Sequence, residues 1–352
     1  MNDPMQTMQA IRFSGNGRIP MSFHINSACW QHYPQGALFD LMESHTYLFP
    51  GFKRPQGVYR PAFNELSIKG QPYADSFGCT WETSEDGILG VVTKHPLADW
   101  AAFDTYQMPD PSVCMGLWPI DWAAEAQSIR AQKANGTPVV AALRHGHTFL
   151  QLCDLRGYEN LMYDMSDEEP RLYRLIEQLE AFNMAIVEQY TSMNVDIMEY
   201  PDDMGMQFTP MLSPAHFRQY LQPSYKRLMR AARDKGIAVH MHSDGCIRDL
   251  IPAMLECGTD IQNLQDVVNG VEWIEENLKG RVCIELDIDR QTITPYGTPQ
   301  QIDALIREEV LRLGSPKGGL MMIYGLYPGV PLANIKALMD AMEAYAFYWE
   351  DR

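Results

Sequence analysis

The sequence predicts a (β/α)8 barrel, or TIM barrel, formed as a single domain by residues 1–352. Short apolar runs alternate along the chain with longer segments of helical periodicity, which is typical of parallel strands covered by helices on both faces. The length of 352 residues is one that α/β barrels use for a single domain. No Gly-x-Gly-x-x-Gly or Walker motif occurs, which disfavours a doubly wound nucleotide-binding sheet.

Seven of the eight barrel strands can be placed on the sequence, and the eighth cannot be located. The strands are expected at 19–25, 138–143, 195–200, 237–242, 260–264, 282–288 and 320–324. Helices are expected at 168–193, 214–235, 247–256, 271–277, 299–313 and 332–348. The pairs Ser213-Pro214 and Thr298-Pro299 are typical helix starts. Residues 50–118 are rich in Gly, Pro and aromatic residues, and they predict an insertion between the first and second strands that has its own hairpin and is a candidate lid over the barrel mouth.

The composition argues against several classes of function. The chain has 28 basic and 45 acidic residues, a net charge of −17, so attraction to nucleic acid or to an anionic membrane surface would have the wrong sign. The seven cysteines are scattered and form no Cys-x-x-Cys pair, which fits a reducing cytoplasm. The N-terminus is unlike a signal peptide, and no segment approaches the ~18 apolar residues of a membrane span. We therefore expect a cytoplasmic protein with a small-molecule substrate.

The fourth predicted strand ends in the most informative stretch of the chain, His240-Met241-His242-Ser243-Asp244-Gly245. Side chains alternate between the two faces of a strand, so His240, His242 and Asp244 share one face. Two histidines spaced by two residues, beside an acid and a glycine turn, favour contact with a metal or a substrate over two hydrogen-bonded core histidines.

Polar residues also follow the other predicted strands. Because the active site of a TIM barrel lies at the carboxyl ends of its strands, these residues are expected to gather at one mouth. They are His24, Asn26, Arg144, His145, His147, Glu199, Asp202, Asp203, Gln207, Gln265, Asp266, Glu285, Asp287, Asp289 and Tyr324. Like charges that are buried together need partners or a cation, so an acidic mouth with two histidines on one strand suits a divalent metal. Imidazole and carboxylate ligands favour zinc, with one position open to the substrate.

Several motifs resemble those of the uroporphyrinogen decarboxylase superfamily, which holds the tetrapyrrole decarboxylase and the zinc-dependent corrinoid methyltransferases. The segment from His147-Thr-Phe-Leu-Gln to Gly157 is similar to the loop and helix after the second strand of that family. Asp202-Asp-Met-Gly-Met-Gln207 resembles its third-strand motif, and Asp289-Arg-Gln291 and Pro331-Leu-Ala-Asn334 resemble its C-terminal pattern. The resemblance covers nearly the whole chain and implies the barrel fold.

Two departures from the family patterns bear on the reaction. The decarboxylase carries an arginine-rich N-terminal segment for the substrate carboxylates, whereas here no arginine occurs between Arg18 and Lys53. The methyltransferases carry a His-x-Cys pair and a distant Cys. In this chain His240 matches the histidine, His242 replaces the first cysteine, and the position of the distant cysteine falls near Tyr324. The methyltransferase branch is therefore the more similar one.

The resemblance implies a metal-dependent methyltransferase that moves a methyl group between a corrinoid or a methoxylated small molecule and an acceptor. His240, His242 and Asp244 would bind a divalent metal, with zinc favoured. Asp203 or Glu199 would be a further ligand or the general base, and Tyr324 or His145 would donate a proton. The residues expected to contact the substrate are His24, Asn26, Arg144, Gln207 and Asp289.

The resemblance also implies partners and leaves two alternatives. The corrinoid would be a substrate or be carried by a partner protein, and relatives of this kind form homodimers. The first alternative is a decarboxylase of uroporphyrinogen or a related carboxylated substrate, in which Asp203 or Asp289 stabilises a pyrrole-like cation without a metal. The second is a non-catalytic barrel that binds a corrinoid or tetrapyrrole.

Overall fold

The computed structural model of the chain describes residues 4–350. The chain forms two compact units. Unit 1 comprises Met1–Gln71, Thr83–Leu89 and Leu264–Arg352, and unit 2 comprises Pro72–Glu82 and Gly90–Asn263. Within the described residues, no helix combines the length and the apolar character that crossing a membrane would need.

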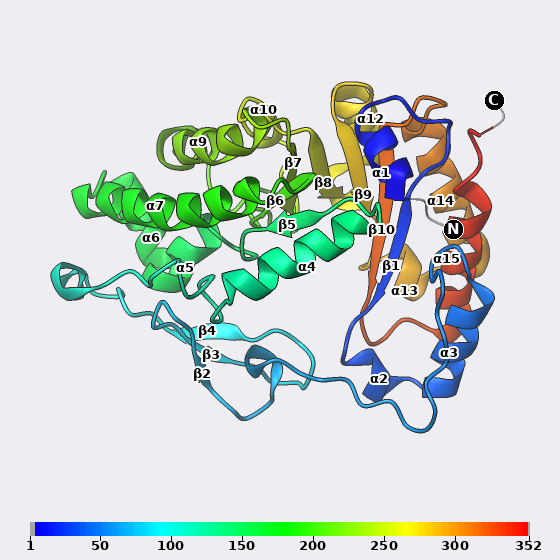
Figure 1. Cartoon of the computed structure of the whole chain (residues 1–352), viewed down its shortest axis with the longest axis horizontal. Helices are drawn as coiled ribbons and strands as arrows, with labels where there is room; N and C mark the ends of the chain where they lie inside the picture. Colours follow the sequence, from blue (N-terminus) through cyan, green and yellow to red (C-terminus); the bar gives the residue numbers. More distant parts are fainter. Residues whose placement is uncertain (1–3, 351–352) are drawn as a thin grey trace. The chain divides into compact units, whose positions relative to one another are not determined.

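The main sheet has seven strands in the order β1-β10-β9-β8-β7-β6-β5, and the pairs with a defined register are parallel (Figure 1). The strands are β1 (Met21–Ile25), β5 (Val140–Ala142), β6 (Ile197–Pro201), β7 (Ala238–Ser243), β8 (Ile261–Gln265), β9 (Cys283–Asp287) and β10 (Leu320–Leu326). All seven predicted strands are thus confirmed. The sheet among residues 4–350 has no eighth strand, so the structure shows a mixed α/β fold that is consistent with the predicted barrel and does not show its closure.

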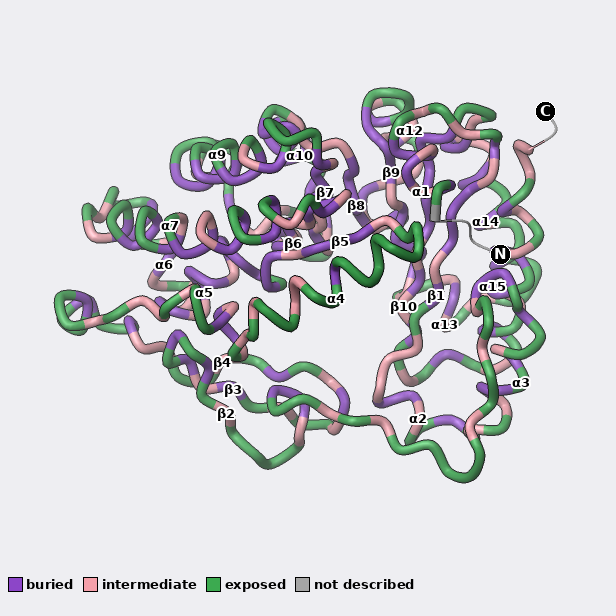
Figure 2. The backbone as a smooth tube through the Cα atoms, in the orientation of Figure 1, coloured by how far each residue is buried: buried purple, intermediate pink, exposed green. Residues whose placement is uncertain are grey.

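Unit 2 contains β5, β6, β7 and the first residues of β8. Four large side chains in the middle of β6 and β7 are fully buried: Met198, Tyr200, Val239 and Met241. Figure 2 shows this part of the sheet as a buried stretch. Burying a large apolar side chain contributes roughly 1.5–3 kcal/mol, so these residues anchor the strands. The helices of unit 2 are η2 (Trp100–Thr105), α4 (Trp122–Ala134), α5 (Phe149–Arg156), α6 (Tyr158–Ser166), α7 (Pro170–Ser192), α8 (Pro214–His216), η3 (Phe217–Leu221), α9 (Gln222–Arg233) and α10 (Ile251–Leu255).

Unit 1 contains β1, β9, β10 and the last residues of β8. Its helices are α1 (Pro4–Ile11), α2 (Cys29–His32), α3 (Gln35–Ser44), η1 (Glu65–Ser67), α11 (Asp266–Asn269), α12 (Val271–Leu278), α13 (Ile293–Tyr296), α14 (Pro299–Leu313) and α15 (Leu332–Tyr345). Helix α14 begins where the sequence predicts. The Thr298 side chain accepts a hydrogen bond from the Gln301 N–H, and the Gln301 side chain accepts one from the Thr298 N–H, which is a capping box.

The predicted insertion contains a small antiparallel sheet of β2 (Tyr73–Ala74), β3 (Thr80–Glu82) and β4 (Val91–Lys94), all in unit 2. The expected hairpin is therefore present. The Asp75 carboxylate supports its turn by accepting hydrogen bonds from the Cys79 N–H at 2.9 Å and from the Trp81 indole at 2.8 Å. The role of this insertion as a lid stays a prediction.

Two predicted helices differ from their observed forms, and a proline explains each difference. The helix expected at 214–235 is divided by the π-helical turn η3, which ends just before Gln222-Pro223. Proline lacks an N–H and its ring collides with the carbonyl four residues earlier, so a regular α-helix cannot pass through it. The helix expected at 247–256 is shortened to α10 because Pro252 is tolerated only in a first turn. Helix α4 was not predicted, although Asp121 caps it by accepting from two N–H groups.

Candidate functional site

Three side chains in unit 2 form a cluster that we call the His-Asp-His cluster: His145, Asp203 and His242. Each offers one potential ligand atom, and these atoms lie within 4.8 Å of one another. The His145 Nε2 is 3.2 Å from one carboxylate oxygen of Asp203, and the His242 Nε2 is 3.3 Å from the other. The two imidazole rings are 5.6 Å apart between centroids. One carboxylate thus bridges two imidazoles.

The parallel register of β6 and β7 creates this juxtaposition. Pro201 is aligned with His242, so the residues that follow β6 emerge beside the end of β7. Asp203 is the second residue after β6, and its Oδ1 accepts a hydrogen bond of 2.8 Å from the Asp244 N–H. The Met204 N–H donates to the Ser243 hydroxyl at 2.9 Å. Backbone and side-chain bonds from the β7 end therefore fix the Asp203 carboxylate beside His242.

Two glycines, one in the loop after β6 and one in the loop after β7, allow these loops to approach closely. A Cβ atom on Gly205 would lie 2.5 Å from the Asp244 carbonyl oxygen, which no side chain can tolerate. Gly245 faces Gly205 directly and has a φ of +80°, a conformation that favours glycine. The Cys246 N–H completes the junction with a hydrogen bond of 2.7 Å to the Met206 carbonyl. The glycine of the Asp244-Gly245 turn is thus required by packing.

Asp203 and His242 each stabilise the charged form of the other. Burial raises the pKa of Asp203, but hydrogen bonds from His145 and His242 outweigh it and hold that pKa well below its usual range. Burial lowers the pKa of His242, but the Asp203 carboxylate, the charge of Asp244 and the contact with Asn263 raise it to about 9. In the absence of a metal, His242 is therefore an imidazolium at neutral pH, paired with the Asp203 carboxylate.

Asn263 fixes the orientation of the His242 ring. Its Oδ1 lies 2.5 Å from the His242 Nδ1, so Nδ1 donates the hydrogen bond and Nε2 is directed at Asp203. A histidine that binds a metal through one nitrogen commonly donates from the other to such a partner. Asn263 was not predicted as a site residue. The signal that could have revealed it was a polar pair, Gln262-Asn263, between the apolar residues Ile261 and Leu264 of the predicted strand.

Asp202, the residue before Asp203, has a structural role. It is fully buried, and its carboxylate accepts hydrogen bonds from the N–H groups of Thr148, Phe149 and Leu150, at 3.1, 2.6 and 3.0 Å, and one from the Tyr225 hydroxyl. These N–H groups lie at the start of α5 and have no partner inside the helix. Asp202 is thus a structural cap, and of the two adjacent aspartates only Asp203 belongs to the cluster.

We expect an Asp202→Ala variant to lose roughly 2–5 kcal/mol of unfolding free energy, because three N–H groups at the start of α5 and one buried hydroxyl lose their acceptor. Urea denaturation followed by circular dichroism would measure the loss. Asp167→Ala is the matched control, since Asp167 is exposed in the same unit and its removal should change the free energy by less than about 0.5 kcal/mol. Equal effects of the two variants would contradict the capping role.

The other predicted site residues of unit 2 lie outside the His-Asp-His cluster. His240 is buried within β7, opposite Glu199 of β6, and Asp244 contacts the cluster through its N–H. The Arg144 side chain is 5 % exposed, and it donates at 2.8 Å to Asp154 and at 2.9 Å to the Gly146 carbonyl. Gln207 is exposed. The roles predicted for these residues stay predictions.

The remaining predicted site residues belong to unit 1. His24 is exposed at the end of β1, and the Asn26 Oδ1 accepts from the Ala28 N–H at 2.8 Å. Asp289 is buried and accepts hydrogen bonds from four consecutive N–H groups, those of residues 291–294. Tyr324 is buried, and burial raises its pKa to about 12. Contact of these residues with a substrate stays a prediction.

Parallel strands that carry a histidine–carboxylate cluster at their carboxyl ends are characteristic of barrel-type α/β enzymes, whose sites lie at these strand ends. The uroporphyrinogen decarboxylase (URO-D) family model matches residues 72–345. The chain therefore belongs to this family, as the sequence motifs suggested.

Two curated proteins are similar in sequence, and one solved structure shares the fold. Two curated proteins, uroporphyrinogen decarboxylases from two strains of Thermus thermophilus, are each 25% identical over 188 residues. That alignment covers 52% of this chain and 51% of theirs, so the chain spans about half the length of these relatives. A methyltransferase from Methanosarcina mazei has the same fold, with a TM-score of 0.62 and 15% identity over 97% of this chain and 98% of that protein.

Proposed function

We propose that the chain is a metal-dependent methyltransferase that moves a methyl group between a corrinoid or a methoxylated small molecule and an acceptor. The observation that carries this proposal is the His-Asp-His cluster. Two imidazole nitrogens and one carboxylate within 4.8 Å of one another supply the three protein ligands typical of a catalytic zinc site, which keeps one further position open. The fold shared with the Methanosarcina mazei methyltransferase supports the same interpretation.

In this proposal, His145, Asp203 and His242 hold the metal, whereas His240 does not. When bound, a divalent metal supplies Lewis-acid chemistry that stabilises the deprotonated form of an acceptor thiol or hydroxyl group. Asn263 keeps the Nδ1 proton of His242, so that Nε2 is the nitrogen offered to the metal. The Asp244 N–H orients the Asp203 carboxylate. The methyl group leaves its cobalt or oxygen atom and bonds to the acceptor, and a leaving oxygen then takes up a proton.

The test compares two histidines of the same strand. We expect purified wild-type chain to retain about one equivalent of metal, His242→Ala to lose it, and His240→Ala to keep it, because only His242 belongs to the cluster. Elemental analysis gives the metal content, and consumption of methylcobalamin in the presence of 2-mercaptoethanol gives methyl transfer. Urea unfolding of both variants verifies that they are folded. Methyl transfer without metal, or loss of metal from His240→Ala alone, would overturn the proposal.

A second candidate function is decarboxylation of a porphyrinogen, which is supported by the similarity to the two uroporphyrinogen decarboxylases from Thermus thermophilus. The stretch without arginine between Arg18 and Lys53 argues against it, because a substrate with many carboxylates needs cationic partners. Release of carbon dioxide from uroporphyrinogen by the purified chain would establish this function. Tight binding of a corrinoid without turnover would instead establish the non-catalytic alternative.

A further inference from the structure

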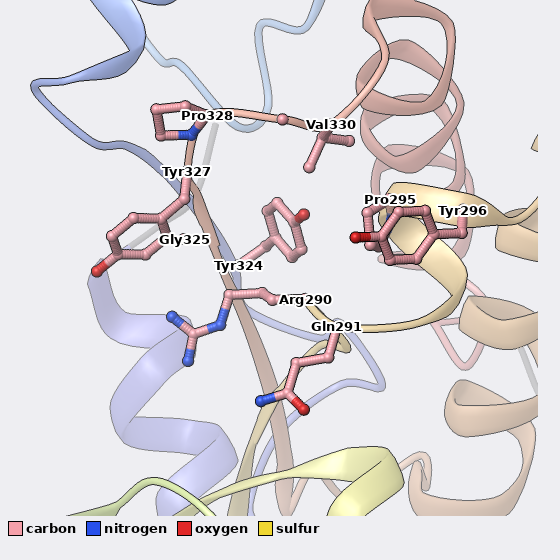
Figure 3. A pocket seen from close by; sticks show the side chains of 10 residues that line it. Arg290, Gln291, Pro295, Tyr296, Tyr324, Gly325, Tyr327, Pro328 and Val330 are labelled. Atoms are coloured by element: carbon pink, nitrogen blue, oxygen red, sulfur yellow. The ribbon is translucent and has the colours of Figure 1, made fainter.

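A pocket of about 340 Å³ lies within unit 1, between the segment that follows β9 and the segment that ends β10 (Figure 3). Arg290, Gln291 and Tyr296 line it from the first segment, and Tyr324 and Tyr327 line it from the second. Its volume is at the lower end of the range of ~300–1,000 Å³ found for ligand sites, so it suits a molecule with a single ring.

Hydrogen bonds from side chains to the backbone hold both walls of the pocket. The Asp289 carboxylate accepts from the N–H groups of residues 291–294 and so fixes the first wall. The Tyr33 hydroxyl donates to the Val330 carbonyl at 2.8 Å and fixes the second wall. The Asn334 amide donates to the carbonyls of Thr294 and Gly297, at 3.0 and 2.8 Å, and joins the two. The pocket is therefore formed before a ligand arrives, which lowers the entropic cost of binding.

Three tyrosines are among the ten residues that line the pocket. Figure 3 shows the ring of Tyr324 between those of Tyr327 and Tyr296. Tyr296 is 84% exposed and Tyr327 is 44% exposed, which is unusual for such large rings. The Arg290 guanidinium lies 5.8 Å from the centre of the Tyr327 ring and pairs with Asp287 at 2.6 Å, so its charge is balanced. Rings that stack with another ring gain about 0.5–1.5 kcal/mol beyond their buried area, and this lining thus favours an aromatic ligand without a net charge.

A hydrogen-bond chain beneath the pocket fixes the direction in which the Tyr324 proton points. The Thr294 hydroxyl donates to the Asp289 carbonyl at 2.5 Å, and this uses its single proton. The Thr294 and Tyr324 hydroxyl oxygens are 3.1 Å apart, so Tyr324 must be the donor between them. The Tyr324 oxygen then has only lone pairs to offer to a ligand. Its pKa, which burial raises to about 12, keeps the phenol protonated in this role.

We propose that this pocket binds a small neutral phenol, whose ring packs against the tyrosine rings of the lining and whose hydroxyl group donates a hydrogen bond to the Tyr324 oxygen. This role reverses the one that the sequence suggested for Tyr324, a proton donor. The proposal uses residues of unit 1 alone and does not depend on the metal or on methyl transfer.

The test measures the dissociation constants of 4-methylphenol and of 4-fluorotoluene, a probe of similar shape that has no donor group. We expect the preference for 4-methylphenol to fall by about 2- to 12-fold in Tyr324→Phe, the range for one neutral hydrogen bond. A second variant, Thr294→Val, frees the Tyr324 proton. This change should improve the binding of the acceptor probe 4-methylbenzaldehyde relative to 4-methylphenol. Isothermal titration calorimetry or ligand-observed NMR gives the constants.

Tyr345→Phe is the matched control, because the Tyr345 hydroxyl is in unit 1 but contacts Asp303 rather than the pocket. Its preference between the probes should equal that of the wild-type chain. An unchanged preference in Tyr324→Phe, or no binding of 4-methylphenol to the wild-type chain up to its solubility limit, would overturn the proposal. The metal content of the same samples reports separately on the proposed function.

Discussion

An Asp203→Asn variant is expected to bind Zn²⁺ at least about 100-fold more weakly than the wild-type chain. Loss of a residue that only hydrogen-bonds to a metal ligand already costs about 10- to 100-fold, and Asp203 is itself a proposed ligand. Competition with a chromophoric chelator at fixed pH measures the affinity. The same change removes the charge that raises the pKa of His242 to about 9. We therefore expect that pKa to fall, since burial, the opposing influence, remains.

NMR titration of the His242 imidazole separates this explanation from a general loss of structure. In the folded variant the His242 pKa should lie well below 9, and in Asp203→Glu, which keeps the charge, it should stay above the ordinary value of 6.5. Asp167→Asn, an exposed substitution in the same unit, should change neither the pKa nor the affinity. A metal affinity unchanged in Asp203→Asn would show that Asp203 is not a ligand.

The raised pKa also sets how the metal affinity of the wild-type chain depends on pH. A metal binds neutral imidazole, so His242 must lose its proton on binding. Because its pKa in the metal-free protein is about 9, the affinity should rise about tenfold per pH unit below that value and level off above it. Calorimetry at pH 7.5 in buffers of different ionisation enthalpy should show release of about one proton. No proton release would contradict the imidazolium state of His242.

The sequence predicted the strands, and it predicted the end of the sheet at which the His-Asp-His cluster lies better than the residues of that cluster. The seven strands follow from apolar runs, which are local features, and all seven are confirmed. His242 and Asp203 lie together as expected at adjacent strand ends, because parallel register brings those ends to one edge. The strand pattern placed His240 and His242 on one face equally, and only tertiary contacts distinguish them: His242 meets His145 and Asp203, whereas His240 is buried opposite Glu199.

Other features depended on contacts that no local pattern encodes. Asp202 and Asp203 are adjacent and chemically identical, yet one caps α5 and the other faces two histidines. The Thr294 hydroxyl lies 3.1 Å from that of Tyr324, a contact between residues 30 apart in sequence that no local pattern encodes. Prolines 223 and 252 were visible in the sequence, and stricter use of the rule that proline breaks helix interiors would have corrected both helices.

A buried pair of acids in unit 1, Asp266 and Glu309, gives the second large effect that we expect. Both residues are at most 1 % exposed to solvent. The Asp266 carboxylate accepts from the N–H groups of Val267 and Asp289, at 2.5 and 2.8 Å. Within the described residues, no N–H or hydroxyl group donates to either carboxyl oxygen of Glu309. Asp266 is thus the member of the pair that can ionise, and Glu309 is the member that keeps its proton.

The pKa values of the pair follow from this arrangement. Burial raises the pKa of Asp266 to about 6, although its hydrogen bonds oppose the rise. Burial, and next the negative charges of Asp266 and Asp289, raise the pKa of Glu309 well above its usual value of 4.5. A group whose pKa is raised by folding stabilises the folded state at pH values below its pKa in the unfolded chain. This stability is lost as the pH rises through its pKa in the folded chain. Each acid therefore destabilises the folded chain as the pH rises above its unfolded pKa, which is 3.8 for Asp266 and 4.5 for Glu309.

Glu309→Gln keeps the shape of the protonated acid and cannot ionise. Its unfolding free energy, relative to that of the wild-type chain, should rise with pH above about 4.5 by up to about 1.4 kcal/mol per pH unit, until Glu309 itself ionises in the folded state. Urea unfolding at pH 5, 6, 7 and 8 measures the difference. Glu308→Gln on the same helix is the control, because Glu308 is exposed and pairs with Arg312. The difference in unfolding free energy between this variant and the wild-type chain should stay nearly constant with pH. A constant difference for Glu309→Gln as well would mean that Glu309 is ionised in the folded chain, which its lack of hydrogen-bond donors argues against.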